Sequence, residues 1–241
     1  MTFPKGQRAI VTGASSGIGE ETALAFARAG IHVALVSRSA DKLETVAQKA
    51  RQLGVDARSY PVDLARVDRV RDEMAAIAAD FSPVDILVNN AGMGYTGTLM
   101  DTPLADWQRV LDLNLTSVFE CVRAVLPMMR DRPGGTIVNV ASIAGKQAFP
   151  NWGAYCVSKF GLMALTQTLA AEERANGIRV AAICPGAVNT SIWETETVRA
   201  DFDRTQMLTP QTVAQSILHI VQLPASATIE ELTLMSNAGV L

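Results

Sequence analysis

A tyrosine and a lysine stand four residues apart in the segment 153–176, whose sequence favours a helix. At that spacing Tyr155 and Lys159 share one face of the helix. A free tyrosine has a pKa of about 10, which makes it a poor base at neutral pH, and a nearby ammonium group lowers that pKa. The pair is therefore a candidate for general acid–base catalysis, with a surface Tyr–Lys pair on an amphipathic helix as the alternative.

Three glycines follow the first apolar run of the chain. They stand in Thr12-Gly13-xxx-Gly17-x-Gly19, between an expected strand at 9–12 and an expected helix at 17–29. Glycines allow the backbone to approach a diphosphate closely, and the N-terminus of the helix then stabilises the negative charge. The pattern therefore predicts a dinucleotide site, and a tight turn between strand and helix is the alternative.

The second expected strand ends in Val36-Ser37-Arg38-Ser39, without an acidic residue. In dinucleotide-binding units, an acid about 20 residues beyond the glycines accepts a hydrogen bond from the ribose 2′-hydroxyl and disfavours a 2′-phosphate. The guanidinium of Arg38 suits that phosphate instead, and Ser37 and Ser39 add hydrogen bonds. We therefore expect NADP(H) rather than NAD(H), the alternative being a solvated arginine at a strand end.

Short apolar runs alternate with helix-like segments along the whole chain. The runs are almost continuously apolar, which is typical of strands buried on both faces of a parallel sheet. We predict a single α/β domain over residues 1–241, a doubly wound, Rossmann-like parallel sheet with helices on both faces, and a substrate loop at about 186–209. The expected strands lie at 9–12, 33–36, a short run ending at 60, 84–88, 136–140, 178–183 and about 230–235, and the expected helices at 17–29, about 40–53, 64–80, 103–130, 153–176 and 210–222.

Composition excludes several other classes of protein. The 241 residues are 49 % apolar, and 21 Lys and Arg against 24 Asp and Glu leave no basic excess for nucleic-acid binding. No apolar run reaches the length of a membrane span, and the N-terminal run is too short for a signal peptide. Three widely spaced cysteines and two isolated histidines have no metal-ligand spacing. We therefore expect no metal site, no membrane segment and a cytoplasmic protein.

Five motifs in order resemble the short-chain dehydrogenase/reductase family over nearly the whole chain. They are the glycine motif at 12–19, Asn89-Asn90-Ala91-Gly92, Asn114, Ser142 with Tyr155-xxx-Lys159, and Pro185-Gly186. The resemblance implies hydride transfer between NADPH and a carbonyl carbon, with Tyr155 as the general acid or base. It also implies that Ser142 holds the substrate carbonyl and that Asn114 keeps a water in line with Lys159.

The same resemblance implies a cofactor groove. It implies that Asp63 contacts the adenine, that Asn89 lines the groove, and that the segment with Val188 and Thr190 binds the nicotinamide carboxamide. Lys159 is expected to reach the ribose hydroxyls as well. The full set of expected cofactor residues is Gly13, Ser15, Ser16, Gly17, Ile18, Gly19, Ser37, Arg38, Asp63, Leu64, Asn90, Ala91, Gly92, Tyr155, Lys159, Pro185, Gly186, Val188 and Thr190.

The expected substrate loop contains four large apolar side chains. They predict a pocket for a hydrophobic carbonyl or alcohol, or else packing of the loop itself or of an oligomer interface. The residues are Ile192, Trp193, Val198 and Phe202.

The resemblance leaves two activities open. We favour a general NADPH-dependent carbonyl reductase or alcohol dehydrogenase, and 3-oxoacyl-carrier-protein reductase is the alternative. An acidic carrier protein needs a basic docking surface, for which Arg123, Arg130 and Arg132 are candidates. The acids at 172–173 weaken that surface, and we expect them, like those at 20–21, on solvated helix faces.

Two other roles are compatible with the same fold. A cofactor-binding regulator without chemistry would lack the Ser, Tyr or Lys of the site, and all three are present. The expected strand at 229–235 and the apolar ending 238–241 predict a homo-oligomer, which the resemblance implies is a tetramer, with a dimer as the alternative. Cys156, beside the tyrosine, is expected to point about 100° away into the core.

Overall fold

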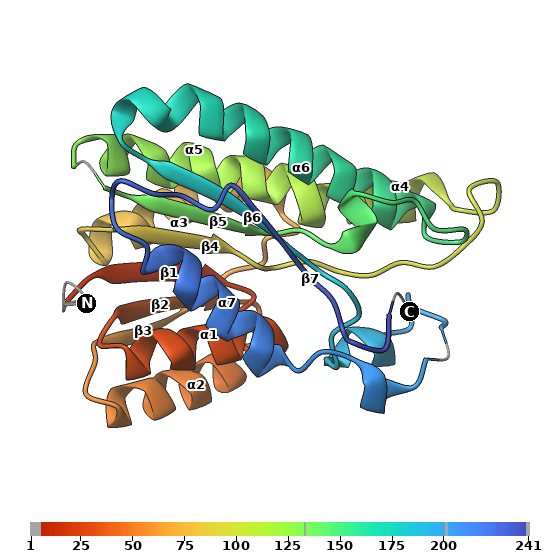
Figure 1. The fold of residues 1–241 in the computed structure, drawn as a ribbon, viewed down its shortest axis with the longest axis horizontal. Helices are drawn as coiled ribbons and strands as arrows, with labels where there is room; N and C mark the ends of the chain where they lie inside the picture. Colours follow the sequence, from red (N-terminus) through yellow and green to blue (C-terminus); the bar gives the residue numbers. More distant parts are fainter. Residues whose placement is uncertain (1–5, 133, 201, 240–241) are drawn as a thin grey trace.

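The computed structural model describes residues 6–132, 134–200 and 202–239, and its elements are given for that part of the chain. Strands and helices alternate from the N-terminus, as the apolar runs predict (Figure 1). The strands are β1 (Arg8–Thr12), β2 (His32–Ser37), β3 (Ala57–Pro61), β4 (Ile86–Asn89), β5 (Thr136–Val140), β6 (Arg179–Pro185) and β7 (Glu231–Leu234). The helices are α1 (Gly17–Arg28), α2 (Ala40–Gln52), α3 (Val67–Asp80), α4 (Leu104–Leu111), α5 (Ser117–Arg130), α6 (Gly153–Glu173) and α7 (Pro210–Val221).

The strands form one parallel sheet in the order β3-β2-β1-β4-β5-β6-β7. The chain moves outward from β1 to β3 and then returns to β4 on the other side of β1. In doubly wound sheets, ligands bind at the carboxyl ends of the strands where the order reverses in this way. The predicted Rossmann-like sheet is confirmed, and its switch point lies between β1 and β4.

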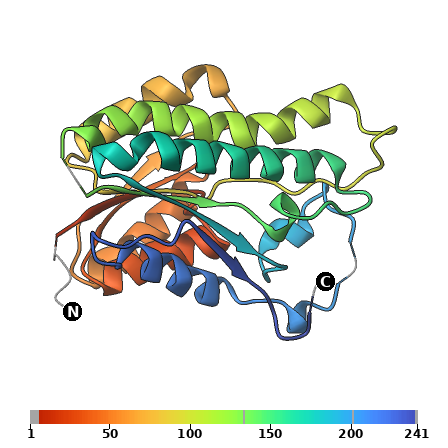
Figure 2. The ribbon, with the colours of Figure 1, turned by 45° about the horizontal axis from the view of Figure 1, so that its top comes forward.

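Alternate side chains of the central strands enter two separate cores. Ala9 and Val11 pack with residues of α1, α2 and α7 on one face of the sheet, whereas Ile10 packs with residues of α3 and α5 on the other. Helix α6 lies beside α5 on that second face (Figure 2). Burial on both faces explains the continuous apolar runs, since each fully buried aliphatic side chain stabilises the fold by roughly 1.5–3 kcal/mol.

Two helical regions differ from the expectation, one at its start and one in its interior. α3 begins at Val67 rather than 64, because the Asp63 carboxylate accepts a hydrogen bond from the amide of Ala65 at 3.1 Å and directs a turn there. The expected helical region 103–130 is divided by a π-helical turn at Asp112–Thr116, between α4 and α5. This turn contains one of the expected site residues, Asn114, so the irregularity lies at the candidate site.

Glu173 is buried, contrary to the expectation of a solvated face, with 1 % of its surface exposed. Its carboxylate accepts hydrogen bonds from the guanidinium of Arg130, with Nε and Oε2 2.9 Å apart, and from Asn176 Nδ2 at 2.8 Å. The two charged residues meet because α5 and α6 lie side by side and end together (Figure 2). The guanidinium holds the pKa of the Glu173 carboxyl below its ordinary value.

The three cysteines are free and buried, and Cys156 lies in the core as expected. Within the described ranges, no helix combines the length and the apolar character needed to cross a membrane. The same residues contain no group of three His, Cys, Asp or Glu side chains arranged to hold a metal ion.

Candidate active site

The glycine loop turns tightly from β1 into α1. Gly13 has a φ of 66°, and a Cβ atom there would lie 2.8 Å from Asn90 Nδ2. A Cβ atom at Gly19 would lie 2.2 Å from the carbonyl oxygen of Gly13, so a side chain at either position would displace the backbone. α1 begins at Gly17, and its first amides point toward the cleft that Ser15, Ser16, Gly17 and Ile18 line. Gly19 itself supports the loop from behind and does not line the cleft.

A short polar segment follows β2 and begins α2. Ser37, Arg38, Ser39 and Lys42 all line the cleft, and both cations are exposed. The amide of Ser39 donates a hydrogen bond to Ser37 Oγ at 3.3 Å, which orders the strand end. Lys42 lies in the first turn of α2, where a positive charge is unfavourable for the helix dipole. Together these groups form a cationic, hydroxyl-rich end of the cleft.

A single hydroxyl connects the ends of β1 and β4. Thr12 Oγ1 donates to the carbonyl of Val88 at 3.3 Å and accepts from the amides of Asn90 at 2.9 Å and Ala91 at 3.1 Å. Asn90 Nδ2 in turn donates to the carbonyl oxygen of Thr12 at 3.0 Å and to that of Gly13 at 3.3 Å. The two loops that border the switch point are therefore held in one arrangement, with Asn90, Ala91 and Gly92 on the cleft.

Asn89 does not line the groove, contrary to the expectation. It is buried, and its Nδ2 donates to Asn139 Oδ1 at 2.9 Å, while Asn139 Nδ2 donates to Thr166 Oγ1 at 2.9 Å. The side chain is directed toward β5 because β4 and β5 are paired at that register. The asparagine that faces the cleft is the next one, Asn90.

Three polar side chains meet at the other end of the cleft. Ser142 follows the end of β5, and its Oγ accepts a hydrogen bond from the amide of Ala144 at 3.1 Å. Tyr155 and Lys159 lie in the first two turns of α6, with Lys159 Nζ 5.7 Å from the centroid of the tyrosine ring. All three line the cleft. The structure thus brings together the Ser, Tyr and Lys that the sequence suggests.

Asn114 lies behind this group. It is fully buried in the π-helical turn, where its amide side chain exchanges hydrogen bonds with the backbone of Met93 at 2.8 and 2.9 Å and donates to Ser158 Oγ at 3.0 Å. A Cβ atom at Gly92 would lie 3.2 Å from Asn114 Oδ1 and 3.7 Å from Lys159 Nζ. The missing side chain of Gly92 therefore leaves a gap within reach of both polar groups.

The segment after β6 closes the cleft from the opposite side. Gly186 donates to the carbonyl of Leu234 at 2.8 Å, and Val188 pairs with Leu208 in an isolated bridge. The methyl group of Thr190 lies 3.1 Å from where a Cβ of Gly17 would be, so this segment reaches across to the glycine loop. Pro185, Gly186, Val188 and Thr190 line the cleft with Asp63 and Leu64. Its volume is about 1010 Å³.

Comparison with known proteins identifies the family. The profile described as short chain dehydrogenase matches residues 7–200, from the glycine loop to beyond the end of β6. The chain belongs to the short-chain dehydrogenase family. As such it is an oxidoreductase that acts on alcohol or carbonyl groups with a nicotinamide cofactor.

Relatives and solved structures similar to this short-chain dehydrogenase cover most of its length. The 3-oxoacyl-[acyl-carrier-protein] reductase of a Synechocystis species is 35 % identical over 243 aligned positions, covering 99 % of this chain and 98 % of the relative. Glycine betaine reductase ATRR of Emericella nidulans is 34 % identical over 233 positions, but the match is 94 % of this chain and only 18 % of that protein. The structure of an alcohol dehydrogenase from the archaeon Thermococcus sibiricus, complexed with 5-hydroxy-NADP, has a TM-score of 0.89 at 29 % identity, covering 98 % of each chain.

The expectation that the ammonium lowers the pKa of Tyr155 is wrong for this structure of the dehydrogenase. Burial raises the pKa of the Tyr155 hydroxyl, and the neighbouring Ser142 hydroxyl only opposes that shift. Lys159 Nζ instead donates a hydrogen bond to the carbonyl of Val140 at 2.9 Å, and burial lowers the pKa of its ammonium group to about 8. Tyr155 is consequently a protonated phenol at neutral pH, which suits a proton donor.

Sequence reasoning missed several side chains that line the cleft of this dehydrogenase. Lys42 had one available signal, because a lysine in the first turn of a helix opposes the dipole unless another charge requires it. Trp152 stands three residues before Tyr155, one helical turn away, but a tryptophan alone gives no functional signal. The cleft residues that were not predicted include Lys42, Met93, Arg109, Phe149 and Trp152.

The pH dependence of folding stability tests the burial of Lys159. Between its folded pKa of about 8 and the ordinary value of 10.5, the unfolded chain binds a proton that the folded chain has released. The free energy of unfolding of the wild type therefore gains a contribution as the pH rises through this range, by up to about 3 kcal/mol. Lys159→Met lacks that contribution. In urea titrations, the difference in unfolding free energy, variant minus wild type, should decrease from pH 8 to pH 10.5.

Lys49→Met is the matched control, because hydrogen bonding to Glu20 raises the pKa of Lys49 above 10.5. Its difference from the wild type should stay constant over the same pH range. A constant difference for Lys159→Met as well would contradict the buried ammonium.

Proposed function

We propose that this protein is an NADP(H)-dependent carbonyl reductase that interconverts a ketone and a secondary alcohol. One observation carries the proposal. A single cleft joins Ser142, Tyr155 and Lys159 at one end to the glycine loop and two cations, Arg38 and Lys42, toward the other. Such a cleft has a proton donor where the carbonyl is reduced and positive charge where a phosphorylated nucleotide binds.

The residues of the cationic end fit NADP(H). The glycine loop leaves no room for a side chain at Gly13, and the N-terminus of α1 favours a diphosphate. Arg38 and Lys42 favour a 2′-phosphate, and the acid between them, Asp41, does not line the cleft. The similar archaeal structure contains an NADP derivative, which supports the same choice. The proposed cofactor residues are those expected from the sequence, Ser39 included, with Lys42 added and Gly19 supporting the loop.

The side chains of the reactive end have complementary roles in this proposal. NADPH, when bound, supplies the hydride. The phenol of Tyr155 donates a proton to the carbonyl oxygen, and the Ser142 hydroxyl holds that oxygen by a second hydrogen bond. The ammonium of Lys159 stabilises the phenolate that remains, since the buried surroundings strengthen the attraction between the charges. Asn114 Oδ1 and Lys159 Nζ both lie beside Gly92, where a water that relays protons would be within reach of the two groups.

A second candidate is 3-oxoacyl-[acyl-carrier-protein] reductase, the activity named for the Synechocystis relative. Its docking surface would need unpaired positive charge. Arg123 instead pairs with Glu120 at 2.9 Å, Arg130 pairs with Glu173, and Arg132 lies 3.9 Å from Asp85. Because acids partly neutralise all three candidate arginines, we favour a free carbonyl compound over a carrier-bound thioester.

We also propose that the protein is a homo-oligomer. Phe119 on α5 and Val157 and Phe160 on α6 are 44, 46 and 44 % exposed, and the two helices lie side by side (Figure 2). An apolar face of this kind suits a second copy related by a two-fold axis. β7 offers an additional surface as the edge of the sheet, whereas Val240 and Leu241 of the expected apolar ending lie outside the described residues.

The three free cysteines bear on localisation. All are buried, and burial raises the pKa of the thiols of Cys121 and Cys184 to about 12 and about 11. Unpaired thiols are typical of reducing compartments, so we propose a cytoplasmic location, which cell fractionation would test.

Tyr155→Phe tests the proton donor. The ring still packs against its neighbours but has no proton to deliver, so kcat for ketone reduction should fall at least about a hundredfold. The dissociation constant of NADPH should stay within about twofold, as measured by the fluorescence of the bound cofactor. Tyr60→Phe, on β3 and outside the cleft, is the control and should keep its turnover. A Tyr155→Phe variant with most of its kcat would exclude the assignment.

Arg38→Asp tests the cofactor preference. Losing a charge-assisted hydrogen bond to phosphate and adding repulsion should weaken NADPH binding by at least about tenfold and reverse the preference toward NADH. Lys42→Met should weaken NADPH binding less and leave NADH binding unchanged. Arg71→Asp makes the same change of charge on the exposed side of α3 and is the control. Calorimetric dissociation constants that are unchanged in Arg38→Asp would mean that another residue holds the phosphate.

Phe160→Glu tests the oligomer. A charge in the centre of a buried apolar interface is costly, so size exclusion with light scattering should show a smaller assembly than the wild type at micromolar concentration. Leu53→Glu, at a residue that is 45 % exposed beyond α2, should not change the mass. A monomeric wild type would refute the proposal.

A further inference from the structure

Four aromatic rings form a continuous row from the reactive end into the loop at about 186–209. The centroids of Tyr155 and Trp152 are 5.6 Å apart, those of Trp152 and Trp193 5.9 Å, and those of Trp193 and Phe202 5.3 Å. Each pair is edge to face, with interplanar angles of 64°, 72° and 85°. All four rings line the cleft and are only partly buried. We name Trp152, Trp193 and Phe202 the aromatic wall.

Hydrogen bonds hold both tryptophans of the wall. Trp193 Nε1 donates to the carbonyl of Val188 at 2.8 Å, which fixes the orientation of the indole. Trp152 pairs with Gly97 in an isolated bridge, in which the amide of Gly97 donates to the carbonyl of Asn151 at 2.8 Å. The ring of Trp193 and the backbone of Trp152 are therefore in place before any substrate arrives, which reduces the entropy lost on binding.

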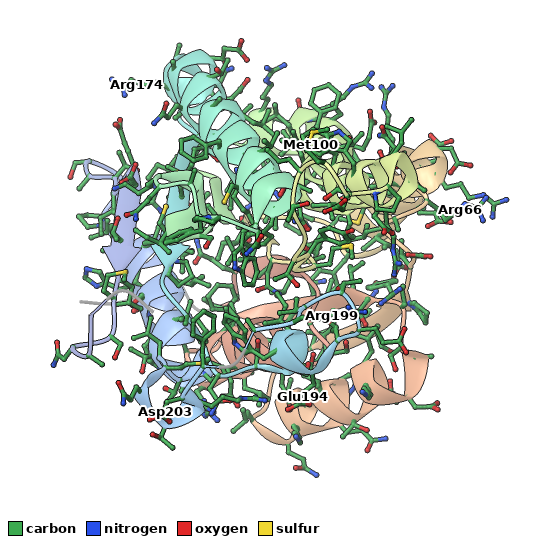
Figure 3. The ribbon with its side chains drawn as sticks, turned by 90° about the vertical axis from the view of Figure 1, so that its right-hand side faces the viewer. Arg66, Met100, Arg174, Glu194, Arg199 and Asp203 are labelled. Atoms are coloured by element: carbon green, nitrogen blue, oxygen red, sulfur yellow. The ribbon has the colours of Figure 1, made fainter. Side chains whose placement is uncertain are left out.

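A second set of hydrogen bonds holds the loop against the segment after β4. The amide of Thr96 donates to the carbonyl of Thr197 at 2.8 Å, Thr197 Oγ1 donates to the carbonyl of Gly94 at 2.8 Å, and the amide of Arg199 donates to Thr96 Oγ1 at 2.7 Å. Val198 is buried there, and a Cβ atom at Gly94 would lie 2.6 Å from its Cγ2. Glu194 and Arg199, labelled in Figure 3, are exposed side chains of this loop. Asp201 lies outside the described residues.

The wall limits which group can lie beside the carbonyl. Its first ring is a direct neighbour of Tyr155, the proton donor of the proposed function, so the substituent bonded to the carbonyl carbon is the part that meets the indoles. Partly exposed ring faces and edges attract another ring by their quadrupoles, in addition to the area that is buried. A saturated substituent of equal size gains only the buried area.

We infer that the substrates of this site are aryl ketones and the corresponding aryl alcohols, and that the aromatic wall selects them. This inference rests on the proposed function. The overall reaction is aryl ketone + NADPH + H⁺ → aryl alcohol + NADP⁺. The hydride forms the new C–H bond at the carbonyl carbon, Tyr155 supplies the proton that forms the O–H bond, and solvent returns a proton to the tyrosine.

Acetophenone and cyclohexyl methyl ketone provide the test, because they differ only in the aromatic character of a six-membered ring. Conjugation makes acetophenone the less reactive carbonyl, so a preference for it must come from the site. We expect the wild type to reduce acetophenone with a kcat/KM at least about tenfold higher than that for cyclohexyl methyl ketone. Affinity can be measured separately with NADP⁺ bound, because the oxidised cofactor cannot reduce either ketone. Calorimetry should then show that acetophenone binds more tightly than cyclohexyl methyl ketone by a similar factor.

Variants of Trp193 show whether the wall causes the preference. Trp193→Leu should lower kcat/KM and affinity for acetophenone about tenfold but change those for cyclohexyl methyl ketone less than threefold, while Trp193→Phe should keep most of the preference. Trp107→Leu, on α4 and outside the cleft, is the control and should match the wild type. NADPH affinity reports whether each variant is folded.

The outcomes distinguish a failure of the aromatic wall from a failure of the proposed carbonyl reductase. Reduction of both ketones without an aryl preference, or equal losses for both in Trp193→Leu, would overturn the aromatic wall and leave the carbonyl reductase intact. If the wild type reduces neither these ketones nor any other with NADPH, the proposed function and this inference both fail.

Discussion

Every strand of the sheet is parallel to its neighbours, and this constraint determines where chemistry can take place. Parallel strands all end at one edge, so segments far apart in the sequence meet there. The strand order runs from β1 outward to β3 and then continues with β4 on the other side of β1. The helices that follow β1 and β4 therefore lie on opposite faces of the sheet. The cleft opens at that point, between the glycine loop and the segment after β4, which Thr12 Oγ1 connects.

The buried ammonium of Lys159 is the main electrostatic consequence of this arrangement. Helix α6 packs on the sheet and buries the amine, and only the carbonyl of Val140 accepts its hydrogen bond among the contacts described above. A charge in such surroundings is costly, yet the same low polarity strengthens its effect on any negative charge that forms nearby. Tyr155 is adjacent and protonated at neutral pH. In the proposed mechanism, the site therefore stabilises a phenolate only once Tyr155 has given its proton to a substrate.

The sequence predicts the parts of this molecule that depend on the backbone and on hydrophobic periodicity. The glycine loop could be recognised because only glycine tolerates its φ angles and close approaches, and the strands because burial on both faces requires apolar runs. Ser142, Tyr155 and Lys159 converge as expected, since helical spacing and strand ends are local properties. The resemblance to a family added the order of the motifs, which spacing alone does not interpret.

The remaining features depend on tertiary packing, which no local pattern encodes. Asn89 and Asn90 are chemically identical neighbours, and only the pairing of β4 with β5 decides which one faces the cleft. Glu173 is buried because α5 and α6 end side by side, and the pKa of Tyr155 rises because the hydroxyl is buried. Lys159 donates to a backbone carbonyl and does not offset that rise. The aromatic wall likewise joins residues from two loops that are distant in the sequence.

Initial rates of NADPH oxidation with two kinds of substrate test the central claim most directly. One is a panel of bulky ketones, the other the acetoacetyl thioester of acyl carrier protein, with NADH as the control cofactor. The account predicts efficient reduction of ketones, little turnover of the thioester and a clear preference for NADPH. A kcat/KM for the thioester at least about tenfold above that for every ketone, or equal use of NADH, would contradict it.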